Sequence, residues 1–80
     1  MTVTVLLFAS YADLLGARSL SVELPLGATV RQLVERLASF PGAEKLPPRP
    51  LVAVNQGYAT ESQVLQQGDE VAVIPPVAGG

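Results

Sequence analysis

The segment Val71-Ala72-Val73-Ile74-Pro75-Pro76-Val77-Ala78-Gly79-Gly80 decides how the rest of the sequence is interpreted. Its first four residues form an apolar run that is typical of a buried strand. Two consecutive prolines cannot both lie inside a sheet, because each lacks an N–H group and holds φ at about −65°. We therefore expect the strand to stop at Pro75 and the chain to leave it in a stiff, extended conformation.

Residues 76–80 are predicted to form a functional tail. Five extended residues reach roughly 16–18 Å, enough to insert the terminal carboxylate into a cleft of a neighbouring protein. The last two are glycines, which are thin enough to pass through a narrow channel. No serine or charged residue follows Asp69-Glu70, and the sequence stops directly after the second glycine. The alternative is a frayed terminus without a role, but these details favour a tail whose reactive group is the α-carboxylate of Gly80.

The composition predicts one small domain and excludes several kinds of chemistry. Residues 1–75 should form that domain, and a chain of 80 residues buries only about 60% of its unfolded surface. There is no cysteine and no histidine, so disulfides, a thiol nucleophile and the commonest general base and metal ligand are all absent. The net charge of −2 comes without a basic stripe, which argues against nucleic acid as a partner. The apolar run at residues 3–9 is too short to span a membrane, so we expect a soluble, cytoplasmic protein.

The first third of the sequence predicts two strands that pair antiparallel. In residues 2–9 the side chains alternate between a face with Val3, Val5 and Leu7 and a face with Thr2, Thr4, Leu6 and Phe8. Residues 10–16 are predicted to make a short helical turn that Gly16 closes. Residues 19–24 alternate again, with Leu20, Val22 and Leu24 directed inward.

The remaining sequence predicts one main helix and two further strands. Thr29 is a good N-cap with Gln32 three residues later, and the apolar spacing continues to Ala38. The range 42–50 contains three prolines and is expected to be a loop without regular structure. A strand over residues 51–55, a turn at 56–57, an extended piece at 58–60 and the last strand give the order ββαββ. The predicted fold class is α+β, a mixed sheet with one helix across it.

This order resembles the ubiquitin-like β-grasp fold, and several motifs are similar to those of the small, sulfur-carrying subunits of molybdopterin synthase. The similarity spans nearly the whole chain. Two departures are Ile74, where the family often has an aromatic residue, and Tyr11-Ala12-Asp13, where it often has an arginine before the leucine. The matching segments are Val5-Leu6-Leu7-Phe8-Ala9 with Leu14-Leu15-Gly16, Ala28-Thr29-Val30 with Leu33, Val52-Ala53-Val54-Asn55-Gln56, Gly68-Asp69-Glu70-Val71-Ala72 and Pro75-Pro76-Val77-Ala78-Gly79-Gly80.

The resemblance implies a chemistry for the tail. A ubiquitin-activating-like enzyme would use ATP to adenylate Gly80, and a sulfur donor would displace AMP to leave a thiocarboxylate. The large synthase subunit would then receive the tail, threaded through Pro76, Val77, Ala78 and Gly79, and pass the sulfur to cyclic pyranopterin monophosphate. A heterotetramer of two small and two large subunits is implied in the same way. The chain itself has no phosphate-binding loop and no metal cluster, so we expect a carrier without a bound cofactor, whose catalytic residues lie on its partners.

A docking surface is predicted from the phase of the strands. In the β-grasp fold the first and last strands run side by side, so Leu6, Phe8 and Ile74 should form an exposed apolar patch near the tail. The family resemblance implies that Tyr58 lies near the same edge and joins this patch. The alternative is that Phe8 and Ile74 fill the core. We interpret Asp69 and Glu70 as part of a solvated turn. Other functions left open are a thiamine-type sulfur carrier, a modifier that attaches Gly80 to lysines, and a β-grasp interaction domain with an inert tail.

Overall fold

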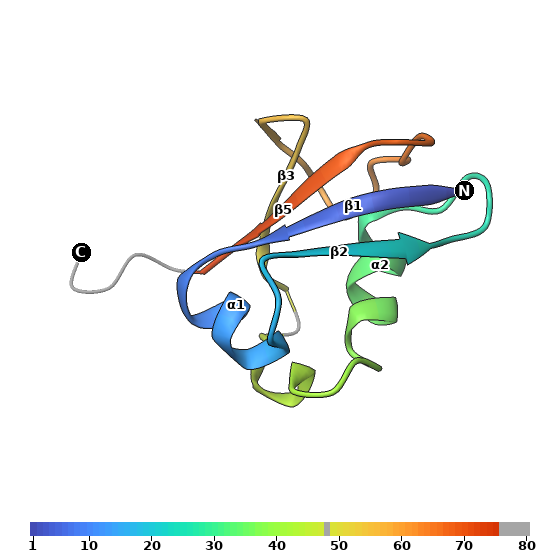
Figure 1. The fold of residues 1–80 in the computed structure, drawn as a ribbon. Helices are drawn as coiled ribbons and strands as arrows, with labels where there is room; N and C mark the ends of the chain where they lie inside the picture. The colour runs from blue at the N-terminus through green and yellow to red at the C-terminus, as the bar shows by residue number, and fades with distance from the viewer. Residues whose placement is uncertain (48, 76–80) are drawn as a thin grey trace.

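The architecture is a mixed five-stranded sheet with one main helix packed across one of its faces (Figure 1). The computed structural model describes residues 1–47 and 49–75. Its elements, in chain order, are β1 (Thr2–Leu7), α1 (Ala9–Leu15), β2 (Ser19–Glu23), α2 (Val30–Leu37), the 3-10 helix η1 (Ala43–Lys45), β3 (Leu51–Val54), β4 (Gly57–Tyr58) and β5 (Glu70–Ile74).

The two ends of the domain meet at the centre of the sheet. The strand order is β2-β1-β5-β3-β4, so the first and last strands are neighbours. They run parallel, with Val5 opposite Val71 and Leu7 opposite Val73. β2 pairs antiparallel with β1, and β3 pairs antiparallel with β5. The predicted antiparallel first pair and the parallel pairing of first and last strands are both confirmed, and β5 lies between two partners.

The core lies between the sheet and α2. Side chains at every second position of β1 and β5 are fully buried, as the alternation in the sequence predicts. α2 contributes Val30, Leu33 and Leu37, which are also buried. Each such side chain stabilises the fold by about 1.5–3 kcal/mol relative to leaving it in water. The core residues of the two strands are Val3, Val5, Leu7, Val71 and Val73.

The start of α2 is fixed by a reciprocal pair of hydrogen bonds. The backbone N–H of Gln32 donates to Thr29 Oγ1 at 3.3 Å, and the backbone N–H of Thr29 donates to Gln32 Oε1 at 2.8 Å. The predicted capping box is therefore present. The helix ends at Leu37, and the exposed Ala38 is its C-cap, so the apolar spacing through Ala38 extends one residue beyond the helix.

The loop predicted over residues 42–50 contains one regular element, which corrects that expectation. η1 begins after Gly42, which has a φ of +89°. A Cβ atom at this position would overlap the backbone carbonyl oxygen of Leu14 at the end of α1. Because only glycine permits this close approach, the turn is set by a contact between α1 and η1 that no local sequence pattern reveals.

The segment after β3 also differs from the predicted extended piece at residues 58–60. Gly57 and Tyr58 form β4, a strand that the sequence did not predict, and it pairs with β3. Asn55 and Gln56 make the two-residue hairpin turn, with φ values of 48° and 73°. The observed order of strands and α-helices is therefore βαβαβββ, with the short helix α1 between the first two strands and a short strand at the sheet edge.

Asp69 has the turn role that the sequence predicts. Its carboxylate accepts hydrogen bonds from Asn55 Nδ2 at 3.0 Å and from the Gln66 N–H at 2.7 Å. The Glu70 N–H donates to Asn55 Oδ1 at 3.0 Å. These bonds join the β3–β4 hairpin to the beginning of β5, so both acidic residues belong to the scaffold.

Candidate functional site

The helix-free face of the sheet carries a continuous apolar surface. Residues that are opposite one another in a ladder point to the same side of a sheet. Leu6 is opposite Ala72, Ala72 is opposite Ala53, and Ala53 is opposite Tyr58, which makes one row across four strands. Ile74 and Leu51 form the next row. We call this surface the docking face; it consists of Leu6, Phe8, Leu51, Ala53, Tyr58, Ala72 and Ile74.

Three large side chains of the docking face are open to solvent. Phe8 is 48% exposed, Leu51 is 50% exposed and Tyr58 is 77% exposed. Leu6 and Ile74 are half-buried. The ladder registers place Leu6, Tyr58 and Ile74 on the same side of the sheet, and Phe8 follows β1 with its side chain outside the core. Leu51 is not among the predicted patch residues; its alternation with the buried Val52 is the signal that indicates it.

The docking face lies at the end of the sheet where the tail begins. β5 ends at Ile74, just before the two prolines, as predicted. Leu7 is opposite Val73, so Phe8 and Ile74 follow at the same end of their strands. Figure 1 shows α1 at the end of the sheet where β5 stops. Pro76, Val77, Ala78, Gly79 and Gly80, the predicted threading and reactive residues, lie outside the described residues.

Helix α1 fixes the backbone that carries Phe8. Phe8 is the N-cap of α1, and its carbonyl oxygen accepts hydrogen bonds from the N–H groups of Tyr11 and Ala12 at 3.0 and 3.4 Å. Tyr11 is buried and joins the core, so it anchors α1 beneath this corner. Ala9 has a φ of 46°, a conformation that costs roughly 1–2 kcal/mol for a residue with a Cβ atom. The backbone at Phe8 is therefore fixed by β1 on one side and by α1 on the other, and the exposed aromatic side chain projects from it.

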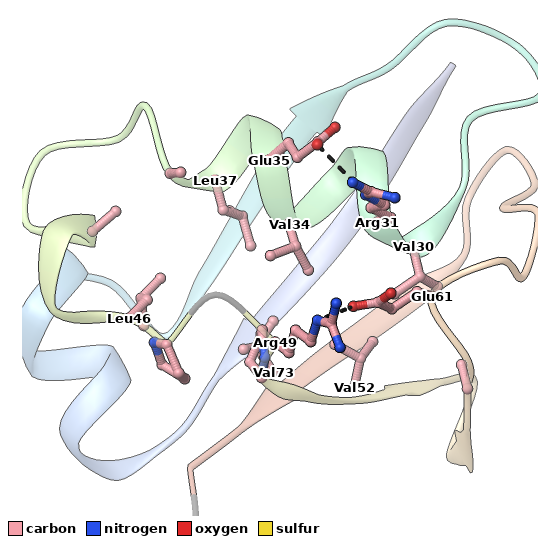
Figure 2. A pocket seen from close by; sticks show the side chains of 15 residues that line it. Val30, Arg31, Val34, Glu35, Leu37, Leu46, Arg49, Val52, Glu61 and Val73 are labelled. Atoms are coloured by element: carbon pink, nitrogen blue, oxygen red, sulfur yellow. Dashed lines mark ion pairs between the residues drawn. The ribbon is translucent and has the colours of Figure 1, made fainter.

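A separate pocket lies on the helix side of the sheet. Figure 2 shows it between α2 and the segment that leads into β3. Its volume is about 390 Å³, and Val30, Val34, Leu46, Val52 and Val73 make up much of its apolar lining. The charged residues among its described lining are Arg31, Glu35, Arg49 and Glu61.

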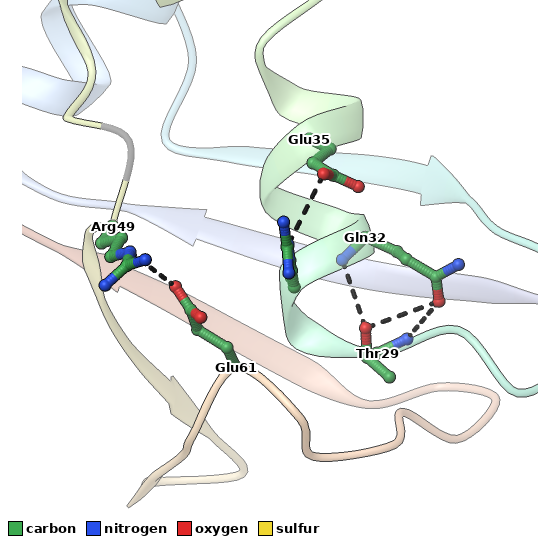
Figure 3. A network of polar contacts seen from close by, with 6 residues as sticks. Thr29, Gln32, Glu35, Arg49 and Glu61 are labelled. Atoms are coloured by element: carbon green, nitrogen blue, oxygen red, sulfur yellow. Dashed lines mark hydrogen bonds and ion pairs between the residues drawn. The ribbon is translucent and has the colours of Figure 1, made fainter.

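The charged groups at the mouth of this pocket form exposed ion pairs. Arg31 Nε lies 3.7 Å from Glu35 Oε2, and Arg49 Nε lies 3.5 Å from Glu61 Oε1 (Figure 3). All four side chains are at least half exposed, so each pair contributes well under about 1 kcal/mol to stability. Their arrangement is typical of a solvated surface.

Metal-binding clusters and membrane-spanning helices can be assessed for the described residues. Within residues 1–47 and 49–75, no group of three or more acidic side chains is placed to hold a metal ion. In the same ranges, no helix is long and apolar enough to cross a membrane. What the described part of the molecule presents is an exposed apolar surface close to Ile74, the last residue of β5.

These features define a class of protein, the small ubiquitin-like β-grasp domains. The chain belongs to the ThiS family of sulfur carriers, whose model matches residues 5–80. Two curated relatives are named molybdopterin synthase sulfur carrier subunit. The one from Arabidopsis thaliana is 37% identical over 98% of this chain and 82% of its own length. The one from Homo sapiens is 38% identical over 98% of this chain and 93% of its own length.

Solved structures agree with the ubiquitin-like β-grasp fold. SAMP1 from Haloferax volcanii has a TM-score of 0.88 and 29% identity, and the match covers 100% of both chains. A structure of H. volcanii small archaeal modifier protein 1 has a TM-score of 0.84 and 28% identity, over 95% of this chain and 98% of that one. A complex of subunits 1 and 2 of the molybdopterin-converting factor from Helicobacter pylori contains a chain with a TM-score of 0.74 and 21% identity, over 100% of both. At that identity the last match supports the fold alone.

Proposed function

We propose that this chain is the sulfur-carrier subunit of a molybdopterin synthase and that the carboxylate of Gly80 carries the sulfur. The observation that supports the proposal most is the position of the apolar docking face, which reaches Ile74 where β5 continues into Pro75-Pro76-Val77-Ala78-Gly79-Gly80. A partner that binds this face also receives the tail. The names of the two curated relatives support the same function.

The chemistry follows from the weak electrophilicity of a carboxylate. A ubiquitin-activating-like partner transfers AMP from ATP to the Gly80 carboxylate and releases pyrophosphate. A sulfur donor then attacks the acyl carbon and displaces AMP, which leaves a thiocarboxylate. The large synthase subunit takes this sulfur for cyclic pyranopterin monophosphate. The carrier is non-catalytic in this scheme: it supplies the acyl group and the tail that delivers it, and its partners supply the catalytic residues.

The docking face sets how both partners recognise the carrier. An exposed apolar patch of this kind on a small domain marks a protein interface, and buried aromatic anchors dominate binding energy. Phe8, Leu51 and Tyr58 are the anchors that the geometry supplies. Because the same carboxylate must enter each partner's cleft, the activating enzyme and the large subunit should bind the same face and exclude each other. A heterotetramer of two small and two large subunits is the assembly we propose.

Intact mass spectrometry tests the proposed chemistry. After incubation with ATP, the activating enzyme and a sulfide source, the chain should gain about 16 Da from the exchange of oxygen for sulfur. Fragmentation should place the gain on Gly80. A variant extended by one residue beyond Gly80 is the control and should gain nothing. If the unextended chain shows no gain while the same enzyme modifies another carrier, the sulfur-carrier proposal is wrong and the inert-tail interaction domain takes its place.

A pair of matched variants tests the docking face. Phe8→Ser should weaken binding to the large subunit about tenfold or more, because it removes an aromatic anchor from the interface. Leu26→Ser is the control, since Leu26 is 85% exposed and lies in the loop that follows β2, away from the tail root. Both affinities can be measured by isothermal titration calorimetry. Equal affinities for the two variants would show that the partner binds elsewhere.

The second candidate is a protein modifier that attaches Gly80 to lysine side chains. The resemblance to H. volcanii small archaeal modifier protein 1 favours it. Both functions begin with the same adenylate, so activation alone cannot separate them. The acceptor distinguishes the two functions. A modifier gives isopeptide-linked products in a lysate, whereas a synthase subunit returns to a free carboxylate after sulfur transfer. A thiamine-type carrier, the remaining relative, would transfer sulfur without pyranopterin.

A further inference from the structure

Strand β2 forms a free edge of the sheet. It is the outermost strand, and β1 is its neighbour on the other side. The N–H and C=O groups of Leu24 both bond to Met1, and the Arg18 C=O accepts from the Leu7 N–H. Since inward and outward groups alternate along an antiparallel strand, Leu20 and Val22 also face β1. The backbone groups of Ser19, Ser21 and Glu23 therefore point away from the sheet.

These outward groups have no protein partner in the described part of the chain. No hydrogen bond within residues 1–47 and 49–75 uses the N–H or C=O of Ser19, Ser21 or Glu23. The strand contains no proline and no lysine, which are the usual devices that protect an edge. The opposite edge differs, because β4 is only two residues long. Figure 1 shows β2 along the border of the sheet, with α2 behind it.

We infer that β2 is a pairing surface for β2 of a second copy of this chain, antiparallel about a twofold axis at Ser21. In this register Ser21 faces Ser21 of the second copy, and Ser19 faces its Glu23. All three outward residues are then paired, and each opposed pair exchanges two N–H···O bonds. Serine beside serine or glutamate can also hydrogen-bond through the side chains, so the surface is complementary to itself.

The sequence of β2 disfavours registers shifted toward its carboxyl end. A shift centred on Val22 places Pro25, which has no N–H group, opposite Ser19. A shift centred on Glu23 places two like charges directly opposite each other, which is destabilising. A shift centred on Leu20 pairs only Ser19 and Ser21 with each other. In the register centred on Ser21, Leu20 of one copy lies opposite Val22 of the other, on the helix side of the joined sheet.

This dimer leaves the docking face free. β1 separates β2 from β5, so the interface does not include the strand that bears the tail. A twofold axis perpendicular to the sheet keeps both docking faces on the same side. Because the two β2 strands run antiparallel, the two tails leave from opposite ends of the joined sheet. The pairing surface is thus independent of the proposed sulfur chemistry.

Amide hydrogen exchange measured by NMR tests the pairing. We expect the Ser19, Ser21 and Glu23 amides to become protected as the concentration of the full-length chain rises from about 20 μM to about 1 mM, a range suited to a weak dimer. Sedimentation equilibrium at the same concentrations should show a dimer. A monomer at the upper concentration, or a dimer in which these three amides stay unprotected, would overturn the proposal.

A lysine substitution at the twofold axis tests the register. Ser21→Lys places two like charges opposite each other and should weaken the dimer about tenfold or more. The Ser21 side chain is exposed, so the monomer should keep its fold. Ser62→Lys is the matched control, because Ser62 is also exposed and lies in the loop between β4 and β5. Equal dimerisation of the two variants would refute the inferred register.

Discussion

Replacing Gly42 with alanine should destabilise the domain far more than the same change at Gly27. The two glycines have nearly the same backbone conformation, with φ values of +89° and +82°. They differ in their surroundings, since a Cβ atom at Gly42 would overlap the backbone oxygen of Leu14, whereas no atom lies within 4 Å of one at Gly27. The pair therefore separates backbone strain from the tight contact between α1 and η1.

The expected losses follow from these two terms. Gly27→Ala should lower the free energy of unfolding by roughly 1 kcal/mol, the cost of placing alanine in the left-handed conformation. Gly42→Ala has the same conformational cost. In addition, the backbone at residue 42 must move away from the backbone of Leu14, which for overpacked sites costs about 1–3 kcal/mol more. The total of roughly 2–4 kcal/mol is a large part of the stability of so small a domain.

Urea unfolding followed by circular dichroism measures both losses. With a slope of about 1 kcal/mol per molar urea, Gly27→Ala should lower the midpoint by about 1 M and Gly42→Ala by about 2–4 M. Equal midpoints for the two variants would mean that α1 and η1 do not meet as closely as described.

Three further changes have defined outcomes in the same unfolding assay. Gln56→Gly should stabilise the domain by about 0.5–1 kcal/mol, because Gln56 has a φ of 73° in the hairpin turn; an unchanged midpoint would argue against that turn. Thr29→Ala should cost about 1 kcal/mol by removing the capping box, and a loss below about 0.3 kcal/mol would contradict its role. Arg49→Ala should change stability by less than about 0.5 kcal/mol, since its ion pair is exposed, and a larger loss would show that this surface is more buried.

The features that the sequence predicts well are those with a local cause. The capping box at Thr29 and Gln32, together with the apolar spacing, predicts where α2 begins. The alternation in β1 predicts which side chains are buried, and this alone separates Phe8 from the core. The two prolines predict where β5 ends. The parallel pairing of β1 and β5 has no local signal, and it was available only from the resemblance to the β-grasp fold.

The features that the sequence hides depend on contacts between distant segments. The turn of η1 exists because Gly42 meets Leu14, and a proline-rich stretch gives no sign of this. β4 is too short for any periodicity and is created by its hairpin turn. Leu51 belongs to the docking face because of its register with Ile74. Tyr11 is buried although its neighbours in the sequence are small or charged.

The position of β5 has a mechanical consequence for whatever holds the end of the chain. β5 has four registered pairs with β1 and four with β3. A force applied beyond Pro75 acts along the strand, so it loads the hydrogen bonds of both ladders in shear and at the same time. At an edge strand pulled sideways, the bonds would instead open one after another. A pull on Pro75 along the axis of β5 should therefore leave the strands paired up to a higher force than a sideways pull on an edge strand would.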